Sequence, residues 1–250
     1  MKENNMKKVI CFFLFIIFAN VLNAQTAEEI VQTAEDLIKG ETAHGTFKMT
    51  VKTPDYTRVL KMESWWIGNE KALIVINSPK KEAGNKTLKV GNEMWEYLKN
   101  TESVIKIPYS MMLQSWNGSD FTNDDIVHEA DLSEDYYLKK VKGGDIGNVM
   151  CWKIELTPKS SSSVVWGRLY YWVRQTDYLP ALVQYYDENG TLIREMIFSK
   201  IKKFSGRKIP STWTMVDRQN DGYSTTFQIL SVKFDIYIDD NTFSLSELEK

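Results

Sequence analysis

The first regular pattern of apolar and polar positions in the chain is that of a helix. Its apolar positions recur at the spacing of one helical face: Ile30, Val31, Ala34, Leu37 and Ile38. Thr26 precedes this stripe and Glu29 follows three residues later, which is the pattern of a capping box. Gly40 comes after the last apolar position, as is typical of a helix end. We therefore predict one amphipathic helix, whose apolar stripe needs a sheet to pack against.

Downstream of this helix the period changes to two. Phe47, Met49 and Val51 alternate with polar residues, as in a half-buried strand. Runs of strand length continue to about residue 238, and the links between them are short and rich in turn residues: Gly68-Asn69, Gly91-Asn92, Gly143-Gly144, Asn189-Gly190 and Asp221-Gly222. Such links favour tight hairpins, so neighbours in sequence should pair antiparallel. The pattern predicts an up-and-down meander of about eleven strands.

Several of these runs are apolar on both faces. Leu169, Tyr171 and Val173 point one way, while Tyr170 and Trp172 point the other way. A half-exposed sheet would not need a second apolar face, so we expect an inner concavity as well as an outer cover. A strongly twisted meander of this size curls and can enclose space. The predicted fold is mainly β with covering helices (α+β), an incomplete antiparallel barrel around an apolar cavity.

The stretch from Met94 to Asp125 is the most informative part of the chain. After a strand and Pro108 it becomes rich in Met and Trp, and it holds no His or Cys. One interpretation is a lid over the cavity, because thioether side chains adapt to irregular apolar shapes; the other is a short core helix. Our candidates for the lid and the cavity lining are Leu60, Met62, Trp66, Trp95, Met111, Met112, Trp116 and Phe121. The sequence does not decide which face of each strand points inward.

Two blocks in this stretch carry a family resemblance. Ser-Met-Met-Leu-Gln-Ser-Trp (residues 110–116) and Gly-Ser-Asp-Phe-Thr-Asn-Asp-Asp (residues 118–125) resemble a divergent branch of the outer-membrane lipoprotein-sorting proteins, the LolA/LolB-like periplasmic carriers. The resemblance implies an incomplete barrel closed by helices around an apolar cavity. It also implies a buried arginine that holds the lid shut in the empty state. The local motif around that arginine does not match here, and the arginines on or beside predicted strands are Arg58, Arg168, Arg174, Arg194 and Arg218.

The N-terminal residues have the pattern of an export signal. Lys2, Lys7 and Lys8 precede an apolar run from Val9 to Phe18, which is too short for a membrane span of roughly 20 residues. We expect a signal peptide over residues 1–24, cleaved near Ala24-Gln25, and a single LolA-like half-barrel domain over residues 25–250. No Cys lies at the cleavage position to take a lipid, so we expect a periplasmic protein with no stable membrane anchor.

Charge and cysteine content exclude some functions. Removing residues 1–24 takes away three Lys and one Glu and changes the formal net charge from -2 to -4. This charge offers no basic field for a nucleic acid or anionic head groups. Only Cys151 remains after cleavage, so no internal disulfide is expected. On a strand beside Trp152, it should be a small buried apolar residue.

The residues with possible chemistry do not form a catalytic pattern. Asp120, Thr122, Asp124 and Asp125 could suggest a cation loop, but an EF-hand needs Gly at its sixth position and Glu at its twelfth, where the chain has Asp125 and Asp131. Capping of a short helical turn explains them more simply. The histidines, His44 and His128, lack metal-ligand spacing, and no nucleophile elbow or phosphate loop is present. We therefore predict no metal site, no cofactor and no enzyme activity.

The combined prediction is a periplasmic carrier that binds the acyl chains of lipoproteins, or another lipid, for transfer toward the outer membrane. The resemblance implies an inner-membrane transporter and an outer-membrane acceptor as partners. The main alternative is an accessory or interaction subunit of an envelope lipid or hydrophobic-compound exporter, with the same fold and no transferable cargo. An enzyme that uses the cavity is a third and weaker alternative.

Overall fold

The computed structural model describes residues 25–127, 132–162 and 164–250. The predicted signal peptide (residues 1–24) and His128 lie outside these residues. The helices and short helical turns are α1 (Ala27–Lys39), η1 (Tyr109–Met111), η2 (Trp116–Gly118), α2 (Asn123–Val127), α3 (Leu132–Asp135), η3 (Asp240–Phe243) and α4 (Leu245–Glu249). The first of them confirms the predicted capping box, because the Thr26 side chain accepts from the Glu29 N–H and the Glu29 side chain accepts from the Thr26 N–H.

The strands form one antiparallel sheet. They are β1 (Thr42–Lys52), β2 (Thr57–Ile67), β3 (Lys71–Ser78), β4 (Lys86–Val90), β5 (Glu93–Leu98), β6 (Ser103–Lys106), β7 (Tyr136–Ile146), β8 (Val149–Pro158), β9 (Arg168–Arg174), β10 (Pro180–Tyr186), β11 (Leu192–Phe204), β12 (Arg207–Asp217) and β13 (Ser224–Phe234). The sheet has 13 strands where about eleven are predicted. Its order is β6-β5-β4-β3-β2-β1-β13-β12-β11-β10-β9-β8-β7, so two meanders join where β13 pairs with β1.

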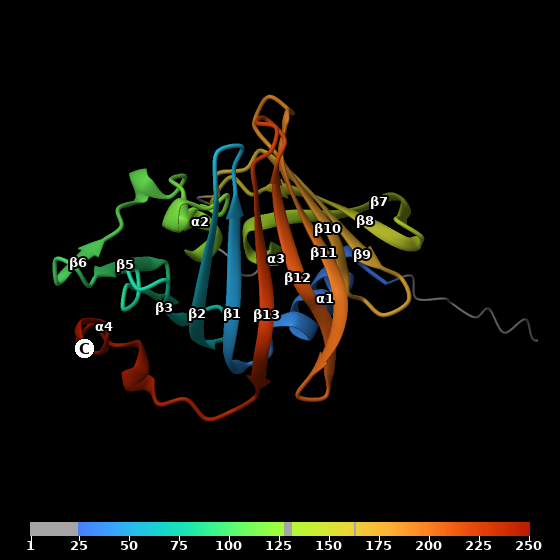
Figure 1. Ribbon diagram of the computed structural model, residues 1–250. Coiled ribbons are helices and arrows are strands. Elements are labelled where there is room, and N and C mark those ends of the chain that lie inside the picture. Colours follow the sequence, from blue (N-terminus) through green and yellow to red (C-terminus); the bar gives the residue numbers. More distant parts are fainter. Residues whose placement is uncertain (1–24, 128–131, 163) are drawn as a thin grey trace, which may run out of the picture.

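The sheet curves strongly and is not closed, because β6 and β7 are its two edges and do not pair with each other. Figure 1 shows α1, α2 and α3 on the concave side, with β1, β2 and β13 in front of them. The predicted incomplete barrel is confirmed. Gly68, Gly91 and Gly190 have positive φ angles in the hairpin turns, as the turn residues indicate.

Apolar side chains form three clusters. One lies on the concave side under β1, β2 and β13, and a second lies between α1 and β8 to β10. The third is on the outer face of β3, β4 and β5, where the C-terminal segment (residues 235–250) packs with Phe243 and Leu248. Figure 1 shows this segment leaving β13 and running below β2 and β3 toward β5. Segments outside the sheet therefore pack against both of its faces, and on the outer face they cover only the part formed by β3, β4 and β5.

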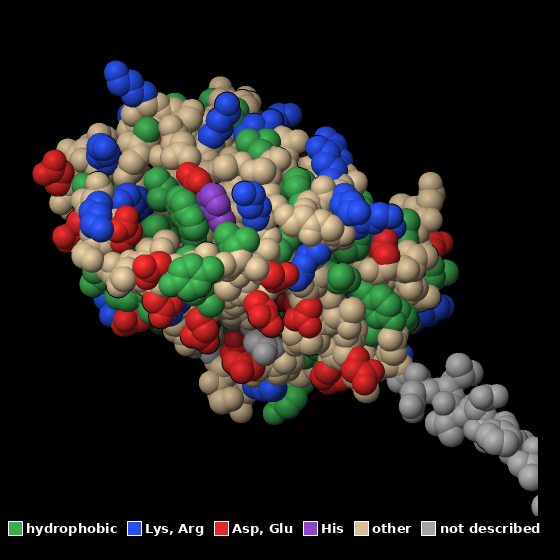
Figure 2. Space-filling model, turned by 90° about the horizontal axis from the view of Figure 1, so that it is seen from below, with side chains coloured by type: hydrophobic (Ala, Val, Ile, Leu, Met, Phe, Trp, Pro, Cys, Tyr) green, Lys and Arg blue, Asp and Glu red, His purple; other side chains and the backbone are tan. Residues whose placement is uncertain are grey.

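Charge is unevenly distributed over the surface. Figure 2 views the molecule from the side of the β11–β12 turn; most Lys and Arg side chains lie in its upper half and most Asp and Glu side chains in its lower half. Helix α1 carries Glu28, Glu29, Glu35 and Asp36 but only Lys39. The surface thus has two regions of opposite charge, although the net charge of the chain is small.

Candidate functional site

A cavity of about 260 Å³ lies on the concave side of the sheet. Its wall is mostly apolar and comes from α1, from the residues that follow β6, and from strands of both meanders. Its aromatic and large aliphatic lining residues are Ile38, Phe47, Met62, Trp66, Ile74, Trp116, Phe121, Ile126, Leu132, Tyr136, Leu156, Val164, Trp166, Leu169, Tyr171, Val183, Tyr185, Met196, Phe198, Trp213, Phe227, Ile229, Val232 and Phe234. The volume is slightly below the 300–1,000 Å³ typical of ligand pockets.

Residues 108–127, which we call the cover segment, close one side of this cavity. They contain η1, η2 and α2, and turn sharply at Asn117 and Gly118, whose φ angles are 48° and 60°. Trp116 is fully buried, and its indole Nε1–H donates to Thr87 Oγ1 on β4 at 3.1 Å. The Trp116 N–H donates to the Phe121 carbonyl oxygen at 2.8 Å, so the turn is closed on itself. Trp116 and Phe121 thereby become part of the cavity wall.

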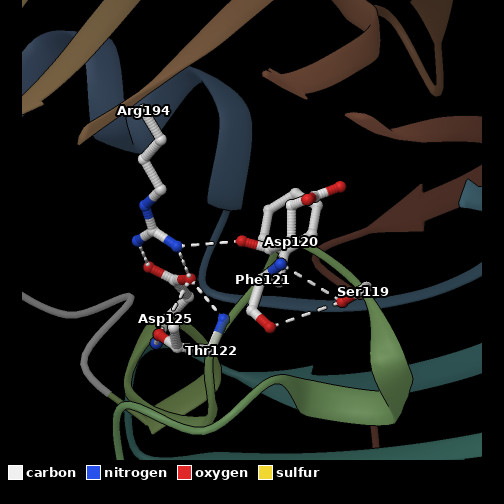
Figure 3. A network of polar contacts seen from close by, with 6 residues as sticks. All are labelled: Ser119, Asp120, Phe121, Thr122, Asp125 and Arg194. Carbon is white, nitrogen blue, oxygen red and sulfur yellow. Dashed lines mark hydrogen bonds and ion pairs between the residues drawn. The ribbon is translucent and has the colours of Figure 1, made fainter. Parts of the chain in front are cut away.

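Arg194, on β11, joins the cover segment to the opposite meander (Figure 3). Its Nη1 donates to Asp125 Oδ2 at 2.8 Å and to the Asp120 carbonyl oxygen at 3.0 Å, while its Nη2 donates to Asp125 Oδ1. The side chains of Arg194 and Asp125 are only 6% and 12% exposed. Such a bidentate, buried pair is strong and directional, and leaving either partner alone would be costly.

Aromatic rings enclose the Arg194 guanidinium. Its Cζ lies 4.3 Å from the centroid of the Trp166 ring and 4.5 Å from that of Tyr185, both of which line the cavity. Burial by itself would lower the pKa of Arg194, but the nearby Asp125 carboxylate offsets this effect, and the pKa is raised overall. Arg194 is therefore a permanent cation at the edge of an apolar cavity. Burial also raises the pKa of Tyr185 well above its ordinary range.

Two further polar contacts attach the cover segment to the sheet. Arg58 Nη2, on β2, donates to the Asn117 carbonyl oxygen. On β13, the Thr225 hydroxyl accepts from the Asp120 N–H at 2.9 Å and donates to Asp120 Oδ2 at 2.6 Å. Burial raises the pKa of Asp120. Polar contacts thus join the segment to β2, β4, β11 and β13, in addition to the apolar packing of Met112, Trp116 and Phe121.

The structure places the eight predicted lid and cavity residues in different surroundings. Met62, Trp66, Trp116 and Phe121 line the cavity. Leu60, Met111 and Met112 belong to the concave-side cluster but do not line the cavity, whereas Trp95 packs in the outer cluster under the C-terminal segment. Whether any of them contacts a ligand stays a prediction.

Other cavity residues were not predicted. Tyr171, Tyr185, Phe198 and Trp213 line the cavity from the second meander, and Arg194 fixes its cover. The alternation of β11, in which Arg194, Met196 and Phe198 share one face, was the available signal.

The polar residues of the cover segment act as capping and pairing groups. Asp125 Oδ2 accepts from the Thr122 N–H at 2.7 Å, and the Asp125 N–H donates to Thr122 Oγ1 at 3.2 Å.

In the described part of the chain no group of three or more His, Cys, Asp or Glu residues could hold a metal ion. His44 lies on the outer face, stacked on Trp65 at 4.7 Å, with Nε2 2.6 Å from Glu63 Oε1. Cys151 is buried, and burial raises the pKa of its thiol. These residues do not meet in one site.

Membrane spans were sought only in the described residues. None of the helices formed by them is long and apolar enough to cross a bilayer.

Solved structures share this fold at low sequence identity. A DUF1329 family protein from Desulfovibrio piger is 21% identical, with a TM-score of 0.81 over 89% of this chain and 97% of that chain. A domain from Vibrio parahaemolyticus, named for outer membrane lipoprotein sorting, is 20% identical and has a TM-score of 0.79. The match covers 90% of this chain and 98% of that chain. A LolA superfamily protein from Nitrosomonas europaea is 20% identical, with a TM-score of 0.77 over 90% and 100%. The predicted resemblance is therefore confirmed for the fold.

Comparison at the level of sequence gives a family. No curated protein sequence matches the chain significantly. A family model with the description "Uncharacterized protein" matches residues 68–250, which include most of the sheet, the cover segment and Arg194. The chain thus has the fold of the LolA superfamily and belongs to the family that this model describes.

Proposed function

We propose that this protein is a non-catalytic carrier that binds the acyl chains of a lipoprotein or another lipid in the concave cavity. The observation that supports this proposal most is an apolar cavity whose cover is attached by polar contacts. The aromatic and aliphatic side chains of the wall suit a hydrocarbon chain, and the fold is that of a LolA superfamily protein. Export to the periplasm and transfer toward the outer membrane belong to the same proposal.

The energetics favour a cavity that opens and closes. Burial of one methylene group contributes about 0.8 kcal/mol, so a chain of roughly 16 carbons would gain on the order of 12 kcal/mol before any cost. A cavity of about 260 Å³ has to widen to take most of such a chain. Movement of the cover segment would both widen the cavity and lower the net affinity, which allows the cargo to leave.

Arg194 is the proposed latch of this cover. In the sorting carriers that the chain resembles, a buried arginine holds the lid in the empty state. Arg194 supports the same role here because it contacts two residues of the cover segment, Asp120 and Asp125, from β11. Separation of Arg194 from Asp125 would expose an ion pair to water and release the segment. An acyl chain that presses on Trp166 and Tyr185 would disturb the rings that enclose the guanidinium.

The test measures lipid directly. Purified protein is denatured and extracted with organic solvent, the extract is analysed by mass spectrometry, and binding of a fluorescent fatty acid is titrated. Ala72→Trp fills the cavity from β3 and should reduce dye binding by tenfold or more. Val59→Trp, on the exposed face of β2, is the matched control and should bind as the original chain does.

Two results would reject the carrier. One is the absence of both co-purified lipid and dye binding in repeated preparations, which would favour an interaction subunit of an exporter. The other is dye binding that Ala72→Trp leaves unchanged, because the dye would then occupy a different place.

A further inference from the structure

The β11–β12 hairpin extends beyond its neighbours in the sheet. The ladder between β10 and β11 ends at Leu182 and Ile197, and the ladder between β12 and β13 ends at Thr212 and Gln228. Beyond these pairs, β11 and β12 continue to pair with each other as far as Phe204 and Arg207. In Figure 1 this end of the hairpin projects below the body of the sheet. It is therefore open to contact from outside.

This end of the hairpin is strongly basic. No Asp or Glu occurs in the sequence between Glu195 and Asp217. Five exposed lysines, which we call the basic end, lie here or on the adjacent part of β13: Lys200, Lys202, Lys203, Lys208 and Lys233. No ion pair joins any of them to a carboxylate within the described residues. Ser205 Oγ donates to the Val232 carbonyl oxygen at 3.1 Å, which places the hairpin turn beside Lys233.

The arrangement of these lysines is unfavourable for the isolated protein. Lys203 and Lys208 stand directly opposite each other in the ladder, and like charges in that position destabilise a sheet. Lysines on an exposed edge can prevent strand pairing, which accounts for those on the free edge of β11. The facing edges of β12 and β13 are also unpaired beyond Thr212 and Gln228, so edge protection extends to Lys208 and Lys233, but it does not require Lys203 and Lys208 to stand opposite each other. A negatively charged partner would relieve the repulsion among them.

Exposed aliphatic side chains accompany the charges. Ile201 on β11 is 38% exposed and Leu230 on β13 is 48% exposed. Lysines are compact point charges on flexible stems, without the planar fork that recognises one carboxylate or phosphate specifically. Several of them beside aliphatic side chains suit a fluid surface that carries many negative charges. We propose that the basic end contacts the surface of a bilayer that contains anionic phospholipids.

The basic end lies next to one end of the cavity. Arg207, in the hairpin, donates through Nη1 to the Asp36 carbonyl oxygen at 3.0 Å and through Nη2 to Asp235 Oδ2 at 2.6 Å. Lys39, in the same last turn of α1, lines the cavity, as do Val232 and Phe234. Contact with a bilayer would therefore bring this end of the cavity to the membrane surface. The contact itself does not depend on the carrier function, since it requires only the exposed lysines.

The net charge of the chain predicts no field for anionic head groups, and this prediction overlooks the basic end. The net charge sums over the acidic α1 and cover segment as well, while a field acts within about 10 Å at 0.1 M salt. The local charge of the basic end, and not the net charge of the chain, therefore determines the attraction to an anionic membrane surface.

The test is co-sedimentation with vesicles of phosphatidylglycerol and phosphatidylcholine, compared with vesicles of phosphatidylcholine alone. The chain should bind the first kind at low salt and lose binding as salt is raised. The triple variant Lys203→Gln, Lys208→Gln, Lys233→Gln should bind roughly a hundredfold more weakly, because each lysine near an anionic surface contributes about fivefold.

A matched triple variant on the opposite part of the sheet is the control. Lys139, Lys140 and Lys142 are exposed on the edge strand β7, and their replacement by Gln changes the net charge equally. This control should bind as the original chain does. Equal loss in both triple variants, equal binding to neutral vesicles, or no binding to anionic vesicles would overturn the proposal. Ala72→Trp should leave vesicle binding unchanged, so failure of the membrane contact and failure of the carrier function are distinguishable.

Discussion

Two segments outside the sheet cover it in different ways. The C-terminal segment packs Phe243 and Leu248 directly against Leu73 and Leu88 on the outer face. The cover segment instead spans the concave face above a cavity, and polar groups of β2, β4, β11 and β13 hold it in place. Apolar burial stabilises a segment only where side chains touch. Directional hydrogen bonds and ion pairs can fix a segment while space remains beneath it.

This difference has a consequence for opening. Detaching the C-terminal segment would expose apolar surface to water, which costs free energy in proportion to the area. Detaching the cover segment would expose the buried side chains of Met112, Trp116 and Phe121 as well, and would also separate the buried pair of Arg194 and Asp125. What distinguishes the cover segment from the C-terminal segment is therefore its buried ion pair with Arg194. Four substitutions test this contrast.

The largest effect is expected for Asp125→Ala. It leaves Arg194 buried between two rings with no carboxylate, and breaking a buried pair in this way costs about 3–5 kcal/mol. The free energy of unfolding, measured by urea denaturation, should fall by that amount. Hydrogen exchange should rise first in residues 112–127.

An exposed ion pair provides the control for this substitution. Asp235, whose partner is Arg207, is 51% exposed in its side chain, so Asp235→Ala should cost about 1 kcal/mol or less. A loss below 1 kcal/mol in Asp125→Ala would show that the Arg194 pair does not hold the cover.

Leu248→Ala tests the apolar side of the contrast. Leu248 is fully buried in the outer cluster, and Leu→Ala in a core costs about 2–5 kcal/mol. The lower part of this range is expected because α4 is only five residues long. Binding of the fluorescent fatty acid should stay unchanged, since the outer cluster does not line the cavity. Leu245→Ala, at a position 48% exposed, should have little effect on either measurement.

A smaller effect is expected for Thr87→Val. The substitution keeps the shape of the side chain but removes the acceptor of the buried Trp116 indole N–H. An unsatisfied buried donor costs about 1–3 kcal/mol, so the unfolding free energy should fall by that amount. Thr50→Val on the outer face of β1 is the control. If the two variants were equally stable, the Trp116 hydrogen bond would not hold the cover.

The sequence predicts the fold well because the signals are local. The capping box, the alternation in β1 and the Gly-containing turns each act over a few residues. The segment with Trp116 and Phe121 is also found, because its composition differs from that of the strands around it.

The details of the site depend on long-range pairing and are harder to predict. Trp95 is among the predicted cavity and lid residues, but its face of β5 packs under the C-terminal segment, about 150 residues later in the chain. Arg194 and Asp125 are 69 residues apart in sequence, and only the curl of the sheet brings them together. Which of two alternating faces points inward is fixed by the global topology.

The smallest effect concerns Asp120, whose side chain binds Thr225 and whose backbone carbonyl binds Arg194. Burial raises its pKa from the ordinary 3.8, so the folded state holds this proton more tightly than the unfolded state. The resulting stabilisation is complete below pH 3.8 and is lost as pH rises through the raised pKa. Asp120→Asn cannot titrate and should lack this decline, which urea denaturation between pH 3.5 and 6 measures.

Asp187 is the control of opposite sign, because its hydrogen bond with Thr191 lowers the pKa of its carboxyl group. Its contribution is present above pH 3.8 and disappears as pH falls, so Asp187→Asn should change the slope in the other direction. If Asp120→Asn kept the original slope, Asp120 would be hydrated in the folded protein. Water would then reach the contact between Asp120 and Thr225 on β13. The cover segment would differ even more from the C-terminal segment, whose contact with the sheet is apolar.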